Sequence, residues 1–350
     1  MAYESPKSRQ AALQEELRRY TDEQFELLDI ISNNPRILVN GLAGTGKTLM
    51  AIEVARRSAA KGQHTLFLCF NRAIARFIYN ETEPLKATVR ATTFHDYVLN
   101  LTDINIPAQV NNEFWRTELP MRALDRLVED PVTYDQIVID EAPDLFFENY
   151  LEVMDLSLDG GLKSGTWSMF GDFYNQVLYS PDQIVDLKAF EKEYNFTACA
   201  FLRNCRNTPS ITKFVDDLGL PGGHYVRTLR PDNGLAPEVI DVDQENSVAD
   251  LVAVLERLYS QNYRGDEIVI LSPYVDGLAT HLPSIRNSRL TPLELSVRGR
   301  IRFSTVYAFK GLESPIVILT DYTARNAGHL ALLYTAATRA LSQFIVLQRS

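Results

Sequence analysis

The chain has 350 residues, of which 45% are hydrophobic, and a formal net charge of −10 at pH 7. This length and apolar content allow two ordinary cores, so we expect two domains rather than one. The acidic balance argues against a protein whose whole surface attracts nucleic acid, although it leaves room for a local basic groove.

Cysteine use and hydropathy indicate where the protein works. The three cysteines, Cys69, Cys199 and Cys205, are odd in number and lack the Cys-x-x-Cys spacing of a metal site, which favours a reducing compartment. The start of the sequence lacks the apolar core of a signal peptide, and the longest uncharged run, 326–338, is too short to span a bilayer. We therefore expect a cytoplasmic protein with no membrane partner.

Predicted strands and helices alternate along almost the whole chain, after a first helix at 9–32. The expected strands lie near 37–40, 65–70, 89–93, 136–140 and 166–171, and then near 197–202, 238–242, 267–272, 301–306, 315–320 and 344–347. In the second series, helices are expected near 208–218, 247–261 and 328–341. This alternation predicts the α/β class, with mostly parallel sheets flanked by helices.

A boundary between two domains is expected within "YSPDQIVD", residues 179–186. We therefore predict an N-terminal domain of residues 1–182 and a C-terminal domain of residues 183–350. The two are similar in size, and only the first carries a phosphate-loop pattern. This organisation is expected when a nucleotide binds in a cleft and the second domain closes on it.

The string "GLAGTGKT", residues 41–48, is the strongest chemical signal in the sequence. It follows a short β-branched strand and precedes apolar residues at helical spacing. Backbone N–H groups of such a loop cradle phosphates at a helix N-terminus, while Lys47 reaches the β/γ oxygens and Thr48 binds Mg²⁺. Glycine-rich turns also occur for structural reasons alone, but these flanks favour ATP binding. The expected cofactor-binding residues of the loop are Gly41, Ala43, Gly44, Thr45, Gly46, Lys47 and Thr48.

A second chemical signal is "QIVIDEAPD", residues 136–144, in which an apolar strand ends in Asp140 and Glu141. Open α/β sheets bind their ligands at the carboxyl ends of strands. We expect Asp140 to hold Mg²⁺ through water and Glu141 to orient and deprotonate the attacking water. Strands often end in acidic residues, so the pair gains its meaning from the phosphate loop that precedes it.

Together with further strings in the same order, these motifs resemble the motor core of superfamily 1 helicases of the UvrD/Rep kind. The resemblance is closest to the helicase halves that in bacteria often follow a nuclease-related (NERD) domain, and it extends from Thr21 to about Arg339. It implies two tandem RecA-like domains that hydrolyse ATP with Mg²⁺ at the cleft between them. The gaps after His95 and after Arg206 are too short for large inserted subdomains, so none is expected.

The resemblance assigns five more residues to the nucleotide. "TDEQFELL" implies Gln24 as the adenine reader, and "FGDFYNQVLY" implies Gln176 as the γ-phosphate sensor. "FLRNCRN" and "LYTAATRA" imply Arg206 and Arg339 as arginine fingers, and "FSTVYAFKGLESPIVIL" implies Glu313 as a ribose ligand. Cations from the second domain can stabilise the transition state only when the cleft is closed. For either arginine alone, an ordinary surface residue is the simpler interpretation. The placement of both in such strings favours the role of arginine fingers.

The strings "CFNRAIARFI", "ATTFHDYV" and "FSTVYAF" resemble segments that contact a single strand. The residues that they assign to nucleic acid are Asn71, Arg72, Thr93, Phe94, His95 and Thr305. Stacking on an aromatic ring and phosphate contacts from Asn, Arg and Thr are how sequence-tolerant grooves bind a strand. The competing interpretation makes Phe94 and His95 core and cap residues, and Asn71 the cap of the following helix.

Three positions depart from the family pattern. Pro143 replaces a glutamine that links nucleotide state to neighbouring motifs, and Cys205 replaces a tyrosine that stacks on adenine. Tyr307 stands where a histidine is frequent, and "GDFYNQ" is one residue longer than the commonest spacing.

The sequence thus predicts an ATPase that moves along, or unwinds, nucleic acid with a single-stranded flank. DNA is the expected strand, although the sequence does not distinguish it from RNA. The alternative is an ATP-dependent switch or assembly subunit that reports nucleotide state to a partner, such as a nuclease in a repair or phage-defence system. A small-molecule kinase leaves residues 197–340 without a role.

Overall fold

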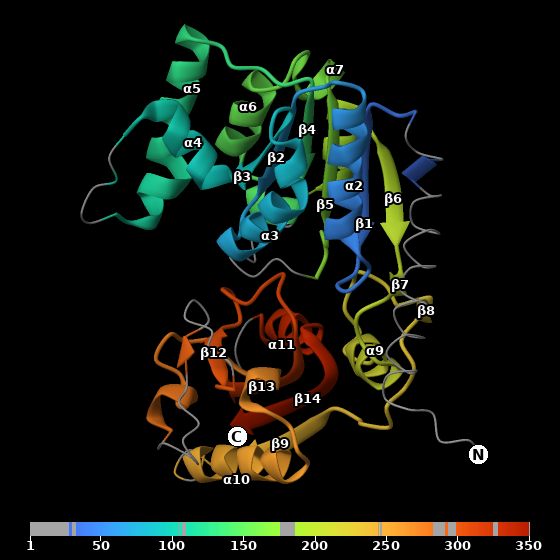
Figure 1. Ribbon diagram of the computed structural model, residues 1–350, viewed down its shortest axis with the longest axis vertical. Coiled ribbons are helices and arrows are strands. Elements are labelled where there is room, and N and C mark those ends of the chain that lie inside the picture. The colour runs from blue at the N-terminus through green and yellow to red at the C-terminus, as the bar shows by residue number, and fades with distance from the viewer. Residues whose placement is uncertain are drawn as a thin grey trace. The chain divides into compact units, whose positions relative to one another are not determined.

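The computed structural model describes residues 28–29, 33–104, 106, 110–175, 186–243, 245, 247–282, 291–292, 299–324 and 328–349. The chain forms two compact units, Met1–Phe173 with Asp182–Phe201, and Tyr174–Pro181 with Leu202–Ser350 (Figure 1). Each unit is an α/β layer structure, which confirms the predicted fold class. The helix expected at 9–32 lies almost wholly outside the described residues, as do Gln24 and Gln176.

Unit 1 is built on a parallel sheet of six strands in the order β3-β2-β4-β5-β1-β6. The strands are β1 (Arg36–Gly41), β2 (Thr65–Cys69), β3 (Val89–Thr93), β4 (Gln136–Ile139), β5 (Thr166–Gly171) and β6 (Thr197–Phe201). Both faces of the central strands are buried, since every residue of β2 and β4 is buried. Burial on both faces explains why these strands read as short continuous apolar runs.

Helices cover the two faces of this sheet. They are α2 (Lys47–Ala60), α3 (Arg72–Thr82), α4 (Phe94–Thr102), α5 (Leu119–Glu129), α6 (Glu148–Leu156), α7 (Gly161–Ser164) and α8 (Leu187–Tyr194). Alternate side chains of β4 belong to different cores: Val138 packs with α2 and α3, whereas Ile137 and Ile139 pack with α4, α5 and α6. A strand of period two between two helical layers requires this alternation.

Unit 2 has its own parallel sheet of six strands, in the order β11-β12-β10-β13-β14-β9. The strands are β9 (Glu238–Val242), β10 (Ile268–Ser272), β11 (Thr291–Pro292), β12 (Arg302–Thr305), β13 (Ser314–Tyr322) and β14 (Ala340–Arg349). The helices are α9 (Pro209–Asp216), α10 (Ser247–Ser260) and α11 (His329–Ala337), and a two-stranded pair joins β7 (Arg203–Asn204) to β8 (Arg227–Thr228). The main core lies between α10 and strands β10, β13 and β14.

The predicted domain boundary at 182/183 is wrong. Strand β6 pairs in parallel with β1, from Ile37 beside Thr197 to Gly41 beside Phe201, so the first unit continues to Phe201. The strand lies at the edge of the sheet, where alternate residues remain partly or fully exposed. The sequence of β6 predicts a strand, but it does not indicate which of the two sheets that strand joins.

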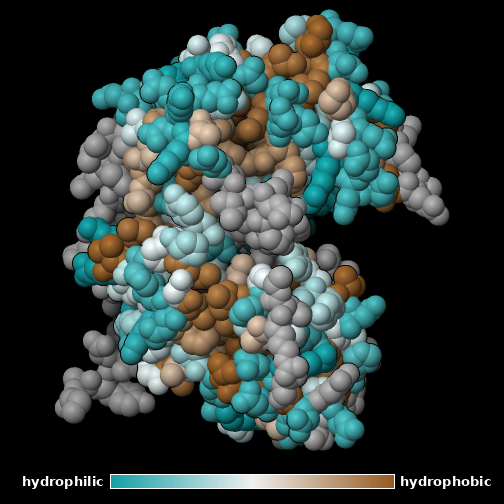
Figure 2. All heavy atoms as spheres, turned by 180° about the vertical axis from the view of Figure 1, so that it is seen from behind, coloured by the Kyte–Doolittle hydropathy of each residue, from teal (hydrophilic) through white to brown (hydrophobic). Residues whose placement is uncertain are grey.

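The surface of the molecule carries both polar and apolar residues. On the face drawn in Figure 2, hydrophilic residues alternate with apolar patches. No helix among the described residues is long and apolar enough to cross a membrane.

Candidate active site

The phosphate loop joins the end of β1 to the start of α2 in unit 1. Its backbone is left-handed at Gly44 (φ 75°) and Gly46 (φ 83°), a conformation that glycine adopts without a steric penalty. Helix α2 therefore starts abruptly at Lys47 and continues for 14 residues. The backbone N–H groups and the dipole at a helix N-terminus favour an anion.

Lys47 lies folded over the loop and is buried. Its Nζ donates to the carbonyl oxygens of Gly41 at 2.8 Å and Leu42 at 3.1 Å, and the Thr45 hydroxyl donates to the same Leu42 carbonyl at 2.8 Å. A Cβ on Gly41 would come within 2.8 Å of the Thr45 Oγ1. The loop is thus held in one shape by its own side chains, with the ammonium beside the glycine backbone.

Thr48 connects this loop to the acidic strand. Its Oγ1 donates to Oδ2 of Asp140 at 2.7 Å, across 92 residues of sequence. Asp140 is fully buried, and its Oδ1 has no hydrogen-bond partner in the part of the chain that the structure describes. Burial and the neighbouring Glu141 charge raise the pKa of Asp140 to about 6.

These atoms fit a magnesium ion. A hydroxyl and a carboxylate are hard oxygen ligands, and Mg²⁺ is usually bound by one or two such groups together with waters and phosphate oxygens. The buried, unpartnered Oδ1 is the kind of atom that a cation would satisfy, and a positive charge there would oppose the rise in the pKa of Asp140. Thr48 and Asp140 are therefore the residues that would hold the ion.

Glu141 follows in a left-handed conformation, with φ 53° and ψ 42°, and is buried. A left-handed backbone at a non-glycine residue costs about 1 kcal/mol or more and persists only where its surroundings impose it. The short 3₁₀ turn Ala142–Leu145 comes next, and Pro143 within it lies against β5. A Cβ on Gly171, the last residue of β5, would be 2.2 Å from Pro143 Cδ. The acidic turn is thus in direct contact with the end of β5.

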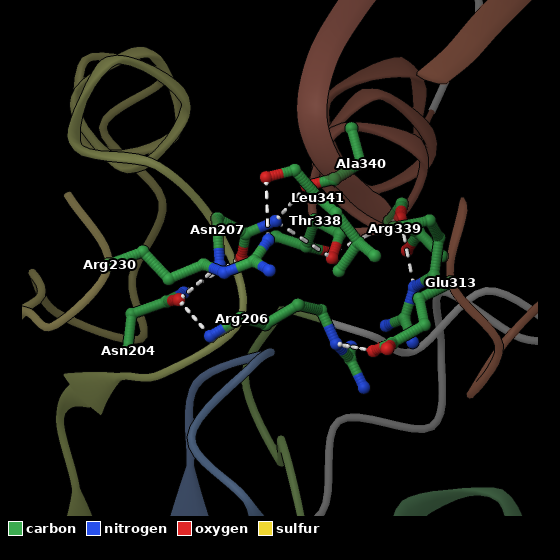
Figure 3. Close-up of polar contacts among 10 residues, drawn as sticks. Asn204, Arg206, Asn207, Arg230, Glu313, Thr338, Arg339, Ala340 and Leu341 are labelled. Carbon is green, nitrogen blue, oxygen red and sulfur yellow. Dashed lines mark hydrogen bonds and ion pairs between the residues drawn. The ribbon is translucent and has the colours of Figure 1, made fainter. Parts of the chain in front are cut away.

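In unit 2, Arg206 lies between β7 and α9, and Arg339 lies between α11 and β14 (Figure 3). The Arg206 Nε donates to Glu313 Oε2 at 2.8 Å, so the predicted finger and the predicted ribose ligand form an ion pair. Arg339 is buried, and its Nε donates to the Thr335 carbonyl at 3.2 Å. It was expected inside a helix at 328–341, but α11 ends at Ala337 and Arg339 lies in the turn before β14.

Two family models match parts of the chain. Residues 300–347 match the UvrD-like helicase C-terminal domain, and residues 6–157 match the type III restriction enzyme, res subunit. The first match contains Thr305, Glu313 and Arg339, and the second contains the phosphate loop and the acidic strand. The two matched segments are therefore similar to helicase-family domains, as the sequence predicts. Neither match bears on an association with a NERD domain, which stays a prediction.

Solved structures similar to this chain include the arterivirus nonstructural protein 10 helicase, alone and in complex with DNA. They are 11% and 12% identical, with TM-scores of 0.46 and 0.44, and both cover 91% of this chain. The chain spans only 61% and 62% of their lengths. At these TM-scores the likeness adds nothing to the assignment. A comparison with curated proteins finds no match.

Three of the residues that the sequence assigned to nucleic acid cap local structure. Asn71 Oδ1 accepts the Ala73 N–H at 2.7 Å and caps α3. Thr93 caps α4, since its Oγ1 accepts the Asp96 N–H at 3.0 Å and donates to the Asp96 carboxylate at 2.8 Å. Thr305, at the end of β12, accepts the Ala308 N–H at 3.1 Å. Capping uses one lone pair of each oxygen, so these contacts leave the strand-binding role untested.

The predicted stacking of Phe94 on a nucleic-acid base is wrong. Its ring is fully buried and stacks on Tyr150, with centroids 4.1 Å apart, so it cannot stack on a base. His95 is partly buried, lies 3.1 Å from the Tyr150 hydroxyl through Nε2, and makes edge contacts with Trp115. Burial lowers the pKa of His95 to about 4, so it is neutral at pH 7. Arg72, by contrast, is 77% exposed, 3.9 Å from Asp96.

Sequence reasoning missed Trp115 and Tyr150, which pack around His95, and the two asparagines that flank Cys205 and Arg206. The aromatic pair lies in segments with no motif, so nothing local identifies it. The asparagines stand in the string "RNCRN". Two amides so close together in a segment between predicted elements indicate a local hydrogen-bond network, because buried polar groups must find partners.

Gly171→Ala tests the contact between the acidic turn and β5. The new Cβ would be 2.2 Å from the rigid ring of Pro143, so we expect the acidic turn to shift and ATP turnover to fall about tenfold or more. Adding Pro143→Ala removes the ring atoms and should restore most of the turnover. The measurement is steady-state hydrolysis with a thermal unfolding curve for each variant. Equal defects in the single and double variants would contradict the contact's role.

Proposed function

We propose that this chain uses ATP hydrolysis to move along single-stranded nucleic acid, and that its usual strand is DNA. The observation that carries the proposal is the bond between Thr48 and Asp140, which unites the phosphate loop and the acidic strand in one buried site. This hydroxyl and this carboxylate are the pair that would hold the Mg²⁺ of a bound ATP, and Glu141 follows directly as the candidate base. The family matches support the same class of enzyme.

Each residue of the site has a chemical role in this proposal. Lys47 would neutralise the β/γ oxygens, and Thr48 with Asp140 would hold the ion. Bound Mg²⁺ would supply charge neutralisation on the phosphates. Glu141, held in its strained backbone beside Asp140, would accept a proton from the attacking water.

Unit 2 would supply the remaining positive charge. Arg206 and Arg339 are proposed to act on a nucleotide bound by unit 1, and Glu313 to contact its ribose. Because charge develops on the transferred phosphoryl group, arginines that arrive only in the reactive state lower the barrier selectively. Gln24 and Gln176 keep their proposed roles, as adenine reader and γ-phosphate sensor, from the family resemblance.

The topology of each unit supports a motor. In unit 1 the sheet order places the ends of β2 and β3, with Arg72 and Thr93, next to β4 and its acidic pair along one carboxyl edge. In unit 2, Thr305 ends β12, whereas Glu313 and Arg339 immediately precede β13 and β14. Because these strands are parallel, Thr305 lies at the opposite edge from the other two. The segment 306–313 therefore connects a proposed strand contact to a proposed nucleotide contact.

The alternative function, an ATP-dependent switch without movement, receives no support from either family match. A protein partner, a cytoplasmic location and a role in antiviral defence remain predictions from the sequence.

Lys47→Ala and Glu141→Gln test the chemistry in unit 1. Loss of the ammonium should weaken nucleotide binding, whereas Glu141→Gln should bind ATP and slow turnover by about a hundredfold or more. Binding of a fluorescent ATP analogue and steady-state phosphate release measure the two effects. Glu148→Gln, at an exposed carboxylate seven residues away, is the matched control. Wild-type turnover in Glu141→Gln would refute its role as the base.

Arg206→Ala and Arg339→Ala test the contribution of unit 2. We expect each to lower turnover by about 10³-fold, while ATP affinity changes far less, because a finger acts mainly on the transition state. Arg227→Ala removes an exposed arginine of the neighbouring β8 and serves as the control. Arg339 is buried, so its variant needs an unfolding curve. Normal hydrolysis in both variants would mean that these arginines are not fingers.

Single-strand stimulation of ATP turnover separates the motor from the switch. A motor should bind single strands with a log–log salt slope of about −0.7 for each phosphate neutralised, and its turnover should rise when the strand binds. Arg72→Ala should reduce this stimulation and leave basal turnover nearly unchanged, whereas Arg126→Ala, an exposed ion-paired arginine of α5, should change neither. If neither DNA nor RNA binds or stimulates at low salt, the switch replaces the motor.

A further inference from the structure

Strand β13 pairs with β14 from Ala340, but on the opposite side of β14 the first residues are held by side chains rather than by a strand. Strand β9 pairs with β14 only from Ile345 onward. Before that point, Asn207 Nδ2 donates to the carbonyl oxygens of Thr338 at 3.1 Å and Ala340 at 2.7 Å. These two carbonyls flank Arg339, whose own carbonyl accepts the Ser314 N–H of β13 at 3.0 Å. The Arg339 N–H also donates to the Ala336 carbonyl of α11 at 3.1 Å, so the backbone around Arg339 is held by α11, by β13 and by one asparagine.

The same asparagine is tied to the backbone of Arg206. Asn204 Oδ1 accepts the N–H of Arg206 at 2.9 Å and that of Asn207 at 2.7 Å. Asn204 Nδ2 in turn donates to Asn207 Oδ1 at 2.8 Å. Both asparagines are fully buried and belong to the same segment as Arg206, and Figure 3 shows Asn207 reaching the segment of Arg339. A continuous set of hydrogen bonds therefore runs from one arginine backbone to the other.

Two outer side chains bind the next carbonyls of β14. Arg230 Nη1 donates to Leu341 O at 2.9 Å, and Asn233 Nδ2 donates to Ser342 O at 2.8 Å. Asn233 is exposed, whereas Asn207 is buried. Because Asn233 contacts the third residue after Arg339 rather than its neighbours, it makes a similar bond without the link to the Arg206 segment.

We propose that Asn207, supported by Asn204, is a positioning residue that fixes the backbones of Arg206 and Arg339 relative to each other. The inference rests on the proposed role of the arginines in ATP hydrolysis. Buried amides and carbonyls leave unsatisfied partners when one is removed, so the arrangement admits few substitutes. Two arginines that act on one transition state gain from a fixed separation, because a shift of about 1 Å in a reacting or stabilising group costs about a hundredfold in rate.

Asn207→Ala is the test, with Asn233→Ala as the matched control. Asn207→Ala should lower the kcat of ATP hydrolysis by about a hundredfold and change the KM for ATP by less than about threefold, because the arginines remain but are misplaced. Asn233→Ala should keep kcat within about twofold of the wild type. Thermal unfolding establishes that each variant is folded. If Asn207→Ala does not fold, Asn207→Ser, a neutral polar side chain too short to bind both carbonyls, carries the same comparison.

A purely structural role is separated by combining Asn207→Ala with Arg206→Ala and Arg339→Ala. If Asn207 acts through the arginines, its removal should change the residual turnover of the double arginine variant by less than about twofold. A further large loss there would overturn the proposal. So would wild-type kcat in folded Asn207→Ala while either arginine variant is impaired. Normal turnover in both arginine variants would instead refute the proposed arginine fingers, and with them the role of Asn207.

Discussion

The hydrogen bond between Thr48 and Asp140 is the contact on which the proposed chemistry depends. It exists because the sheet order puts β5 between β1 and β4, so the loop after β1 and the acid after β4 meet at the same carboxyl edge. Burial and the neighbouring Glu141 charge disfavour the ionised form of the Asp140 carboxylate and raise its pKa. A site that keeps such a group, with no second partner for Oδ1 among the residues that the structure describes, is arranged for a cation rather than for stability alone.

Local chemistry was readable from the sequence, and contacts between distant segments were not. The loop, the acidic strand and most strands follow from residue type and spacing within about ten positions. The membership of β6 depends on which of two sheets it joins, and no residue of "TACAF" records that choice. The end of α11 was missed because Thr338 and Arg339 continue a helical pattern, although the strand that starts at Ala340 takes the backbone away. The prediction for Phe94 failed because an aromatic residue at the end of a strand can pack in the protein core or stack on a nucleic-acid base, and the sequence does not distinguish the two.

Pro143 illustrates how a departure from a family pattern can be replaced by a different contact. An amide at this position would link the acidic turn to its neighbours by hydrogen bonds, which proline's side chain cannot form. Here the ring instead lies against Gly171, where only the absence of a Cβ permits so close an approach. A displacement of the turn after β5 would therefore reach the residues beside Glu141 by direct steric contact. Packed contacts of this kind transmit small shifts because protein interiors have little free volume.

The two arginines of unit 2 are held in different ways, and the difference suits different tasks. The guanidinium of Arg206 is paired with Glu313, whose side chain is 50% exposed. Such a pair contributes only about 0–1 kcal/mol, so a phosphate oxygen can replace the carboxylate at little cost. Arg339 is buried and bound to a carbonyl of the preceding helix α11, so its side chain is held close to its backbone. The asparagine contacts join the backbones of both, which leaves the Arg206 side chain free to change partner without moving its anchor.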